Sequence, residues 1–502
     1  MIKIKMINII IILFVISYSG LLSISDTDTV NTCKERLPNE INGYQPVLVP
    51  VLTPDGNRLY LDRKSHPANR NGVKDFDDIW YSDRLSSNSW TEPKNLLELN
   101  TPESDVLFWI SPDERKGLVY GIYSDDYKNK KQGFSFSEFD GENWSKTLPL
   151  NIKDFYNDSL NFYATMSADE NVLIIAVSRK DGFGGLDLYV SFLDEKKDEY
   201  STPQNLGRDI NTKFDDEAPF LAYDNKTLYF SSNGLKGEGE QDLYMTRRLD
   251  DSWKKWSKPV NLGKKINTKF GEHGICLNSL GDSAIIVSYD TVSKRKGLYS
   301  ICLPREFQPE PYTILTGKIA LENSVDSDNI VLIFVNDKPK QKINIGKLKN
   351  YAIVLADNIF YNIRFEAINC GIIEYELDLK NNKKSQIIKH DLIFHKQVIS
   401  NKIPTIYFDY DSFDINNGNK KKLDELIPEK LHTGKIEIIG HTDTSGTEHY
   451  NFELSKKRAN IVRDYLIRKG FNKNHIFISA KGEKEPISTD NSQNRRVVIL
   501  IK

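Results

Sequence analysis

Three patterns of hydrophobic and polar residues follow one another along the chain. Between residues 45 and 303, short runs of alternating apolar and polar residues are separated by clusters of Gly, Asp, Asn and Ser, which predicts many short β-strands joined by turns. Residues 314–394 carry longer alternating runs, which predict about six further strands and no helix. Residues 404–502 combine strand-like runs with helical periodicity over 416–430 and 450–469, in the order β-α-β-α-β-β that is typical of an α+β domain.

The first of these regions is repetitive, with a period of about 56 residues. Acidic residues in turn positions recur at Asp55, Asp113, Asp169, Asp224 and Asp282. Two markers keep the same phase, an aromatic residue at Trp90, Trp144, Tyr200 and Trp256, and a strand that begins at Asp78, Phe134, Asp187, Asp242 and Gly297. Each unit predicts four strands, and one such sheet cannot bury both of its faces. Several sheets packed radially can, which predicts a β-propeller of about five blades.

The repeat resembles the WD40-like family of the TolB type, also called PD40 repeats, in which S-P-D-G and D-L-Y are the usual signatures. Here they read LTPDG from Leu52, ISPDE from Ile110 and DLY from Asp187. The second unit has FSFS where DLY is expected, which leaves the number of blades open by one. The resemblance implies a propeller over residues 33–305 that serves as a platform for a protein partner. We interpret the recurring acids as turn and capping residues rather than catalytic or metal-binding groups.

The middle region follows the proline-bearing linker REFQPEPYT. Its segments LTGKI and GKLKNYAIVL resemble the carboxypeptidase-regulatory or transthyretin-like domain. The resemblance implies a small β-sandwich over residues 312–395. Because the region carries no catalytic motif, we interpret it as a spacer.

A charged residue occupies a core-facing position in the last region. If residues 450–466 form a helix, Arg458 falls within the same arc of roughly 160° as Leu454, Ala459 and Val462. A guanidinium without a partner costs several kcal/mol to bury. Arg458 therefore needs an anion, which is either the nearby Asp443 or a ligand.

The motifs around these two residues resemble the OmpA-like peptidoglycan-binding domain, over residues 396–502. They are YFDYDSF from Tyr407, GHTD from Gly440, Gly446, Tyr450-Asn451, Leu454-Ser455, Arg458-Ala459, Gly482-Glu483 and NRRV from Asn494. The resemblance implies that the domain binds the diaminopimelate of peptidoglycan. Asp443 would take its ammonium and Arg458 its carboxylate. Asp409, Asn451 and Arg495 match further positions of the ligand pocket.

Composition and motif content argue against nucleic-acid binding, metal binding and catalysis. The formal net charge is −2 and acids and bases are interspersed, which argues against nucleic-acid binding. His441 and His449 flank the GHTD acid without a third ligand at metal-site spacing, so we predict no metal and no cofactor. No nucleophile motif is present, and we predict that the protein is not an enzyme.

The N-terminus predicts export. Lys3 and Lys5 precede an apolar run over residues 7–16 and small residues at Ser17 and Ser19, which is typical of a signal peptide over residues 1–25. An uncleaved membrane anchor is the alternative. If the N-terminal segment completes the last repeat, Cys33 would lie beside Cys302 and could form a disulfide with it.

Taken together, these patterns predict a multidomain protein with a propeller, a β-sandwich and a C-terminal α+β domain. We expect an exported, non-enzymatic envelope protein of a diderm bacterium, at the outer membrane or in the periplasm, which binds peptidoglycan and presents the propeller to an envelope protein. The alternatives are a component of an outer-membrane secretion complex of the type IX kind, although the helical tetratricopeptide segment often found there is absent, and a wall-anchored enzyme with its active site in the propeller funnel. A stator-like inner-membrane anchor is disfavoured because the N-terminal segment has no intramembrane acid.

Overall fold

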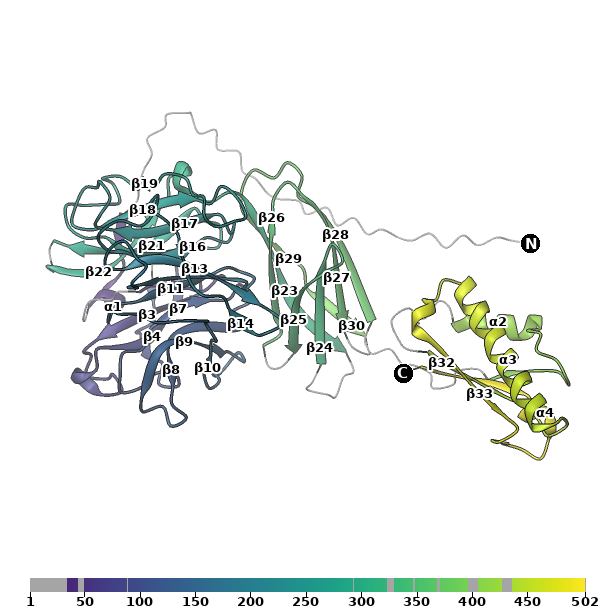
Figure 1. The fold of residues 1–502 in the computed structure, drawn as a ribbon. Helices are drawn as coiled ribbons and strands as arrows, with labels where there is room; N and C mark the ends of the chain where they lie inside the picture. Colours follow the sequence, from purple (N-terminus) through teal and green to yellow (C-terminus); the bar gives the residue numbers. More distant parts are fainter. Residues whose placement is uncertain are drawn as a thin grey trace. The chain divides into compact units, whose positions relative to one another are not determined.

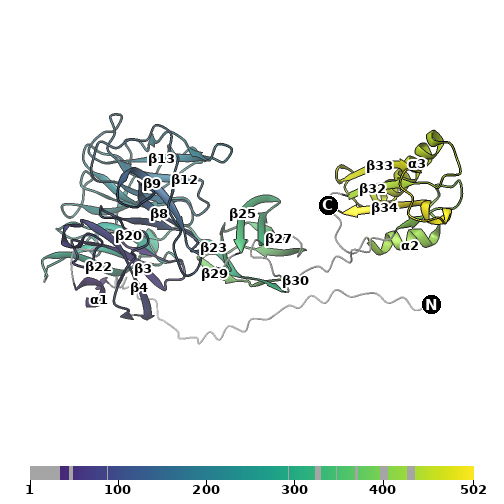
Figure 2. The same ribbon diagram turned by 90° about the horizontal axis from the view of Figure 1, so that it is seen from below.

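A computed structural model describes residues 34–43, 49–87, 89–291, 293–322, 329–345, 348–367, 371–395, 405–426 and 436–501. The predicted signal peptide lies outside these ranges. The chain is mostly β and divides into two compact units (Figures 1 and 2). Unit 1 comprises Met1–Leu315, Ala352–Asp357 and Asn381–Ile388, and unit 2 comprises Thr316–Tyr351, Asn358–Lys380 and Lys389–Lys502. None of the helices described has both the length and the apolar character needed to cross a membrane.

Over the described residues of the repeat region, unit 1 contains five antiparallel sheets of short strands, in the phase of the predicted repeat. The first has the order β2-β3-β4-β5, with β6 also paired to β4; its strands are β2 (Val51–Leu52), β3 (Arg58–Lys64), β4 (Asp77–Ser86), β5 (Ser89–Trp90) and β6 (Lys94–Asn95). The second has the order β10-β9-β8-β7; its strands are β7 (Leu107–Ile110), β8 (Lys116–Tyr123), β9 (Lys130–Glu138) and β10 (Leu148–Pro149).

The third and fourth sheets repeat this plan. The third has the order β11-β12-β13-β14, with β15 also on β13; its strands are β11 (Tyr163–Met166), β12 (Val172–Val177), β13 (Asp187–Asp194), β14 (Glu199–Tyr200) and β15 (Gln204–Asn205). The fourth has the order β16-β17-β18-β19; its strands are β16 (Asp216–Leu221), β17 (Thr227–Ser232), β18 (Asp242–Arg247) and β19 (Val260–Asn261).

The fifth sheet combines the two ends of the repeat region. Its order is β1-β22-β21-β20, and its strands are β1 (Lys34–Arg36), β20 (His273–Leu277), β21 (Ser283–Asp290) and β22 (Arg295–Cys302). β1 pairs with β22, with Lys34 opposite Ile301. The expectation that the N-terminal segment completes the last repeat is therefore confirmed. Cys302 is disulfide-bonded, and its predicted partner Cys33 lies outside the described residues.

Alternation along the strands explains how the sheets pack. In β12, Leu173 and Ile175 belong to one hydrophobic core, whereas Ile174 and Ala176 belong to the next. Successive side chains of a strand point to opposite faces, so this sheet is buried on both sides. The first strands β2, β7, β11, β16 and β20 contact one another in chain order, and β20 contacts β2.

The recurring turn acids do bond within their own turns, as predicted. Ser111 Oγ donates to Asp113 at 2.7 Å, Ser167 Oγ to Asp169 at 2.8 Å and Thr227 Oγ1 to Asp224 at 2.6 Å. Thr53 and Asn278 make the corresponding bonds to Asp55 and Asp282. These acids therefore fix local turns.

The aspartate that begins each D-L-Y strand belongs to a second network. In the third sheet, Asn205 Nδ2 donates to Asp187 at 3.0 Å, Asn211 Nδ2 donates to Asn205 Oδ1 at 2.9 Å, and the Leu188 amide donates to Asn211 Oδ1 at 2.8 Å. The same bonds recur in the first and fourth sheets, through Asn95, Asn100 and Asp78 and through Asn261, Asn267 and Asp242. The network ties the loop after each sheet to the strand beside it.

The middle region has eight strands rather than about six. One sheet has the order β26-β23-β29, with β30 also on β23, and the other has the order β25-β24-β27-β28. Their bounds are β23 (Tyr312–Glu322), β24 (Asn329–Val335), β25 (Lys338–Ile345), β26 (Asn350–Ala356), β27 (Phe360–Ala367), β28 (Gly371–Asp378), β29 (Gln386–Lys389) and β30 (Leu392–His395). In unit 2 the buried rings of Tyr351 and Phe365 meet edge to face, 5.2 Å apart, and join the two sheets.

Over its described residues, the C-terminal segment has the predicted order of elements, with two short helices more. Its sheet runs β31-β34-β32-β33. The elements are β31 (Ile406–Tyr407), α2 (Asn417–Leu426), β32 (Ile436–His441), α3 (Glu448–Arg468), β33 (Ile476–Gly482), α4 (Asn491–Asn494) and β34 (Arg496–Ile501). Thr447 caps α3 by accepting a hydrogen bond from the Tyr450 amide. The 3-10 helix η3 (Lys473–His475) lies between α3 and β33, and the short helices α1 (Asn39–Asn42), η1 (Gly72–Lys74) and η2 (Arg305–Phe307) lie elsewhere in the chain.

Candidate functional site

Helix α3 crosses strand β32 in close contact, and this contact positions the candidate site. A Cβ atom on Gly440 would lie 2.0 Å from the Ser455 carbonyl oxygen, so only glycine fits there. One turn further along α3, Arg458 lies beside the end of β32, and its terminal nitrogen donates to the His441 carbonyl at 3.1 Å. The glycine of the GHTD motif thus lets the helix bring Arg458 to the strand end that carries Asp443.

Arg458 is fully buried, as the helical periodicity predicted. Its Nε donates to the Ser412 carbonyl at 2.7 Å and a terminal nitrogen donates to the Asp409 carbonyl at 3.2 Å, in addition to the bond to His441. Burial lowers the pKa of Arg458 to about 10, against the opposing effect of Asp443, so the guanidinium stays charged at neutral pH. A guanidinium has five N–H donors. Three are used here, and each terminal nitrogen retains one N–H.

Asp443 is buried beside Arg458 but pairs with a different arginine. Its carboxylate accepts hydrogen bonds from Arg495 at 2.9 Å and from the Ser445 amide at 3.1 Å. Burial acts to raise the pKa of Asp443, but these hydrogen bonds outweigh it and the pKa lies below its ordinary value. The alternative in which Asp443 and Arg458 simply pair with each other is wrong. In the described part of the chain, no carboxylate forms an ion pair with Arg458.

Arg495 is the outermost of the three charges. Its side chain is 17% exposed, against 6% for the side chain of Asp443, and Arg458 is completely covered. Its Nε also donates to the Phe408 carbonyl at 3.1 Å. Arg495 thus occupies one oxygen of Asp443 and fixes its orientation.

The other two predicted pocket residues are placed differently. Asp409 gives its carbonyl to Arg458, while its exposed carboxylate makes no hydrogen bond or ion pair within the described ranges. Asn451 is buried in the first turn of α3, and its amide donates to Glu483. The structure thus connects Arg458 with the backbone of the loop 408–416, and Asn451 with the loop after β33.

Sequence reasoning assigned no role to three residues that shape this site. Ser412 supplies a carbonyl to Arg458, Glu483 holds Asn451, and Asp411 accepts a hydrogen bond from the Tyr450 hydroxyl. Asp411 and Ser412 lie in the motif YFDYDSF, and Glu483 lies in the motif Gly482-Glu483. The motifs therefore indicated the positions, but their contacts join segments up to 46 residues apart.

The histidines that flank Asp443 lie in different surroundings. His441 is buried, and burial together with the charge of Arg496 lowers its pKa to about 4, whereas His449 is exposed. His441 is therefore neutral at physiological pH. Among the residues that the structure describes, no three His, Cys, Asp or Glu side chains gather as a metal site requires.

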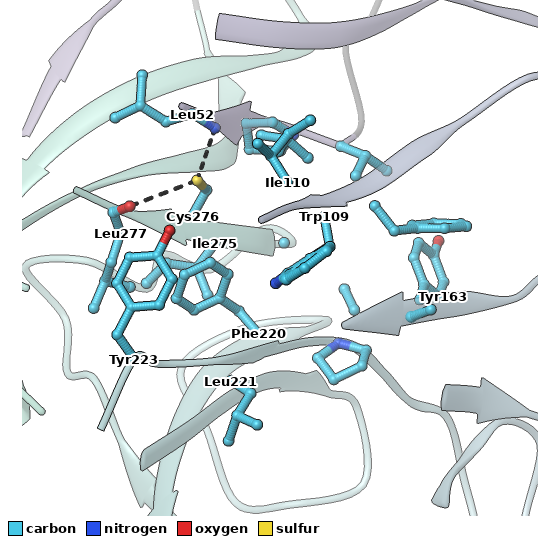
Figure 3. A pocket seen from close by; sticks show the side chains of 18 residues that line it. Leu52, Trp109, Ile110, Tyr163, Phe220, Leu221, Tyr223, Ile275, Cys276 and Leu277 are labelled. Carbon is cyan, nitrogen blue, oxygen red and sulfur yellow. Dashed lines mark hydrogen bonds between the residues drawn. The ribbon is translucent and has the colours of Figure 1, made fainter. Parts of the chain in front are cut away.

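Unit 1 contains a cavity where its five first strands meet (Figure 3). β2, β7, β11, β16 and β20 all contribute to its lining, which includes Trp109, Phe220 and Ile275. The Cys276 thiol accepts a hydrogen bond from the Leu52 amide at 3.1 Å, and burial raises its pKa to about 12. A thiol in this state is a packing group rather than a nucleophile.

One edge of this cavity has a polar contact. The hydroxyl of Tyr163 and Nε2 of His273 are 2.9 Å apart. Burial lowers the pKa of His273 to about 3, with Lys296 adding to the effect, and burial raises the pKa of Tyr163. Both groups are held neutral, so neither is tuned for acid–base chemistry near neutral pH.

Comparison with known proteins supports the predicted resemblance of the last region. Residues 407–499 match the OmpA family. The peptidoglycan-associated lipoprotein of Buchnera aphidicola subsp. Baizongia pistaciae (strain Bp) is 38% identical over 103 residues, which cover 19% of this chain and 60% of that protein. Outer membrane protein A of Bordetella avium is 34% identical over 102 residues, which cover 19% of this chain and 53% of that protein. The match therefore spans little more than half the length of these curated relatives.

A solved structure is also similar to the same region. The crystal structure of the peptidoglycan-associated lipoprotein from Burkholderia pseudomallei is 30% identical, covers 20% of this chain and 89% of its own, and has a TM-score of 0.19. The expectation of an OmpA-like C-terminal domain is confirmed by the family match and the curated relatives.

Proposed function

We propose that this chain is a non-enzymatic envelope protein that binds peptidoglycan non-covalently through the diaminopimelate of the stem peptide. The observation that carries the proposal is Arg458, a buried cation that forms no ion pair with a carboxylate among the described residues, near the anionic Asp443. Both lie in the segment that matches the OmpA family, and a relative of that segment is named a peptidoglycan-associated lipoprotein.

The arrangement suits the two charges at the free end of diaminopimelate. Asp443 would accept the ammonium, since Arg495 and Ser445 leave acceptor capacity on its two oxygens. The remaining N–H groups of Arg458 would hold the carboxylate through charge-assisted bonds. Because Arg458 is completely covered, the ligand would have to displace a neighbouring side chain, and Arg495 is the outermost of the three charged groups of the site.

The proposed domains are a signal peptide over residues 1–25, a propeller over 33–305, a β-sandwich over 312–395 and the wall-binding domain over 396–502. The cyclic contacts of the five first strands and the completion of the fifth sheet by β1 support the propeller. The contact of Tyr351 with Phe365 supports the sandwich.

We place the protein at the outer membrane or in the periplasm of a diderm bacterium, with the propeller turned to an envelope protein partner. The names of the relatives, outer membrane protein A and peptidoglycan-associated lipoprotein, support this location. Membership of an outer-membrane secretion complex would be one form of the same role. A crosslinked pull-down from the native envelope would identify the partner.

The wall-binding role is tested by co-sedimentation of the purified full chain with peptidoglycan sacculi. We expect pelleting with sacculi that contain diaminopimelate and much weaker pelleting with sacculi that contain lysine at the same position, because lysine lacks the second carboxylate. Asp443→Ala should abolish pelleting, and Asp424→Ala, which removes a carboxylate near the opposite end of the domain's helices, should leave it unchanged. Equal pelleting by wild type and Asp443→Ala would refute the assignment.

A further inference from the structure

Three aromatic side chains are exposed around the proposed diaminopimelate site. They are Tyr410, which is 67% exposed, Phe413, 40%, and Tyr450, 49%. Single exposed apolar side chains are normal on protein surfaces, but a group of aromatic ones indicates a binding surface. The hydroxyl of Tyr450 donates to Asp411, which places the start of α3 against the loop that carries the other two rings. We call these three residues the aromatic rim.

The loop of the aromatic rim is fixed to the floor of the site. Arg458 donates to the carbonyls of Asp409 and Ser412, the residues that directly precede Tyr410 and Phe413. The guanidinium of Arg458 also lies over the ring of Phe408, 5.2 Å from its centre. The exposure of Tyr410 and Phe413 therefore does not come from a loosely attached loop. Their rings are presented by a backbone that Arg458 holds.

We propose that the aromatic rim binds the sugar of the glycan strand to which the stem peptide is attached. The inference rests on the proposed function, because it assumes that diaminopimelate lies at Asp443 and Arg458. Diaminopimelate is the third residue of the stem, so an extended chain of at least about 10 Å connects it to the first sugar. Tyr410 and Phe413 directly follow the residues whose carbonyls accept from Arg458, so they lie within the span of the extended stem.

The chemistry of the rim matches a sugar ring. One face of a pyranose presents C–H groups, and the electron-rich face of an aromatic ring attracts such positively polarised edges. The hydroxyls of Tyr410 and Tyr450 and the carboxylates of Asp411 and Asp414 offer partners for sugar hydroxyl and acetamido groups. With Asp409, the loop carries three acids, which argues against an anionic membrane surface as the occupant.

The test compares two ligands on the full-length protein by isothermal titration. One is the stem tripeptide L-alanyl-γ-D-glutamyl-diaminopimelate, and the other is the same tripeptide joined to N-acetylglucosaminyl-N-acetylmuramic acid. We expect wild type to bind the disaccharide-tripeptide about fivefold more tightly, because an aromatic contact contributes about 1 kcal/mol. The double variant Tyr410→Ala/Phe413→Ala should bind both ligands with the affinity that wild type has for the tripeptide.

Phe477→Ala is the matched control. Phe477 is 51% exposed in the same domain, but it is the second residue of β33, at the end of the sheet away from His441 and Gly482. This variant should keep the full preference for the disaccharide-tripeptide. Equal affinity of wild type for both ligands, or an equal loss for both ligands in the double variant, would overturn the role of the rim while the proposed function stands. Absence of any tripeptide binding by wild type would overturn both.

Discussion

The acids of unit 1 and the charges around Asp443 in unit 2 differ in how the protein holds them. In unit 1 the same bonds recur from sheet to sheet, so that Asp78, Asp187 and Asp242 each receive the amide of an asparagine. Among the described residues of unit 2 the arrangement occurs once, and the three hydrogen bonds that Arg458 donates there all go to backbone carbonyls. A buried charge without a counter-charge is costly unless a ligand or a structural role compensates it.

This difference distinguishes acidic residues that stabilise the fold from charged residues that form the proposed binding site. A polar group that recurs with each repeat and with the same partner serves the repeat itself. Arg458, Asp443 and Asp409 follow no repeat, and the described residues leave part of their bonding capacity unused. The comparison predicts that changes in the recurring network of unit 1 affect folding alone, whereas changes at Arg458 and Asp443 affect wall binding.

The largest expected effect is that of Arg458→Ala. The substitution leaves three carbonyl groups without their donor, and we expect a loss of about 3–5 kcal/mol in the stability of the C-terminal domain. Wall binding should be lost as well. Chemical denaturation, monitored by hydrogen exchange of the amides in α3, measures the loss of stability. Lys456→Ala, an exposed position on the same helix, should change stability by less than about 0.5 kcal/mol. A stable Arg458→Ala variant would mean that the three hydrogen bonds contribute little.

A change in the recurring network of unit 1 should lower the stability of unit 1 and leave wall binding intact. Asn211→Ala removes a buried amide that bonds Asn205 and both backbone groups of Leu188, at an expected cost of about 2–4 kcal/mol in the stability of unit 1. Sacculus pelleting by the folded fraction should be unchanged. The exposed Asn161→Ala serves as the control. A loss of wall binding in folded Asn211→Ala would break the distinction between scaffold and site.

A smaller effect concerns pH. The pKa of Asp443 lies below its ordinary value, so the carboxylate stays ionised and wall binding should be constant from pH 8 to pH 5. The stability that this ionised group contributes is present above the pKa of the unfolded state and is lost as pH falls through the lower pKa of the folded state. Pelleting measured across this range tests the expectation.

Arg495→Met sharpens the same prediction. Without the hydrogen bond from Arg495, the effect of burial on Asp443 is less opposed, and its pKa should rise. Binding by the variant should then begin to fall at a higher pH than binding by wild type. Identical pH profiles for the two proteins would show that Arg495 does not control the ionisation of Asp443.

Much of this arrangement could be predicted from local patterns. The helical period gave the burial of Arg458, and the repeat gave the four-stranded sheets and their turn acids. The strand Lys338–Ile345 was missed because Ile343 is its one buried hydrophobic residue among those described, so it lacks an apolar alternation. The partners of Arg458 were not predictable because every residue has a backbone carbonyl, so the residue type does not show which carbonyl accepts.

The pairing of Asp443 with Arg495 was missed for a related reason. The two residues are 52 positions apart, and either arginine could have reached the carboxylate. Only the packing of the segment before β34 against the loop at Phe408 decides between them. Long-range polar contacts of this kind depend on the tertiary structure, whereas the burial of a helix or strand face follows from the hydrophobic period of its own segment.

The most direct test of the account is titration of the full chain with the diaminopimelate tripeptide, comparing wild type with Asp443→Asn. This substitution keeps the size of the side chain and removes its charge. The account predicts one binding site in wild type and an affinity at least about thirtyfold lower in the variant, since loss of a buried charge pair costs about 2 kcal/mol or more. Equal affinities in the two proteins, with both folded, would contradict it.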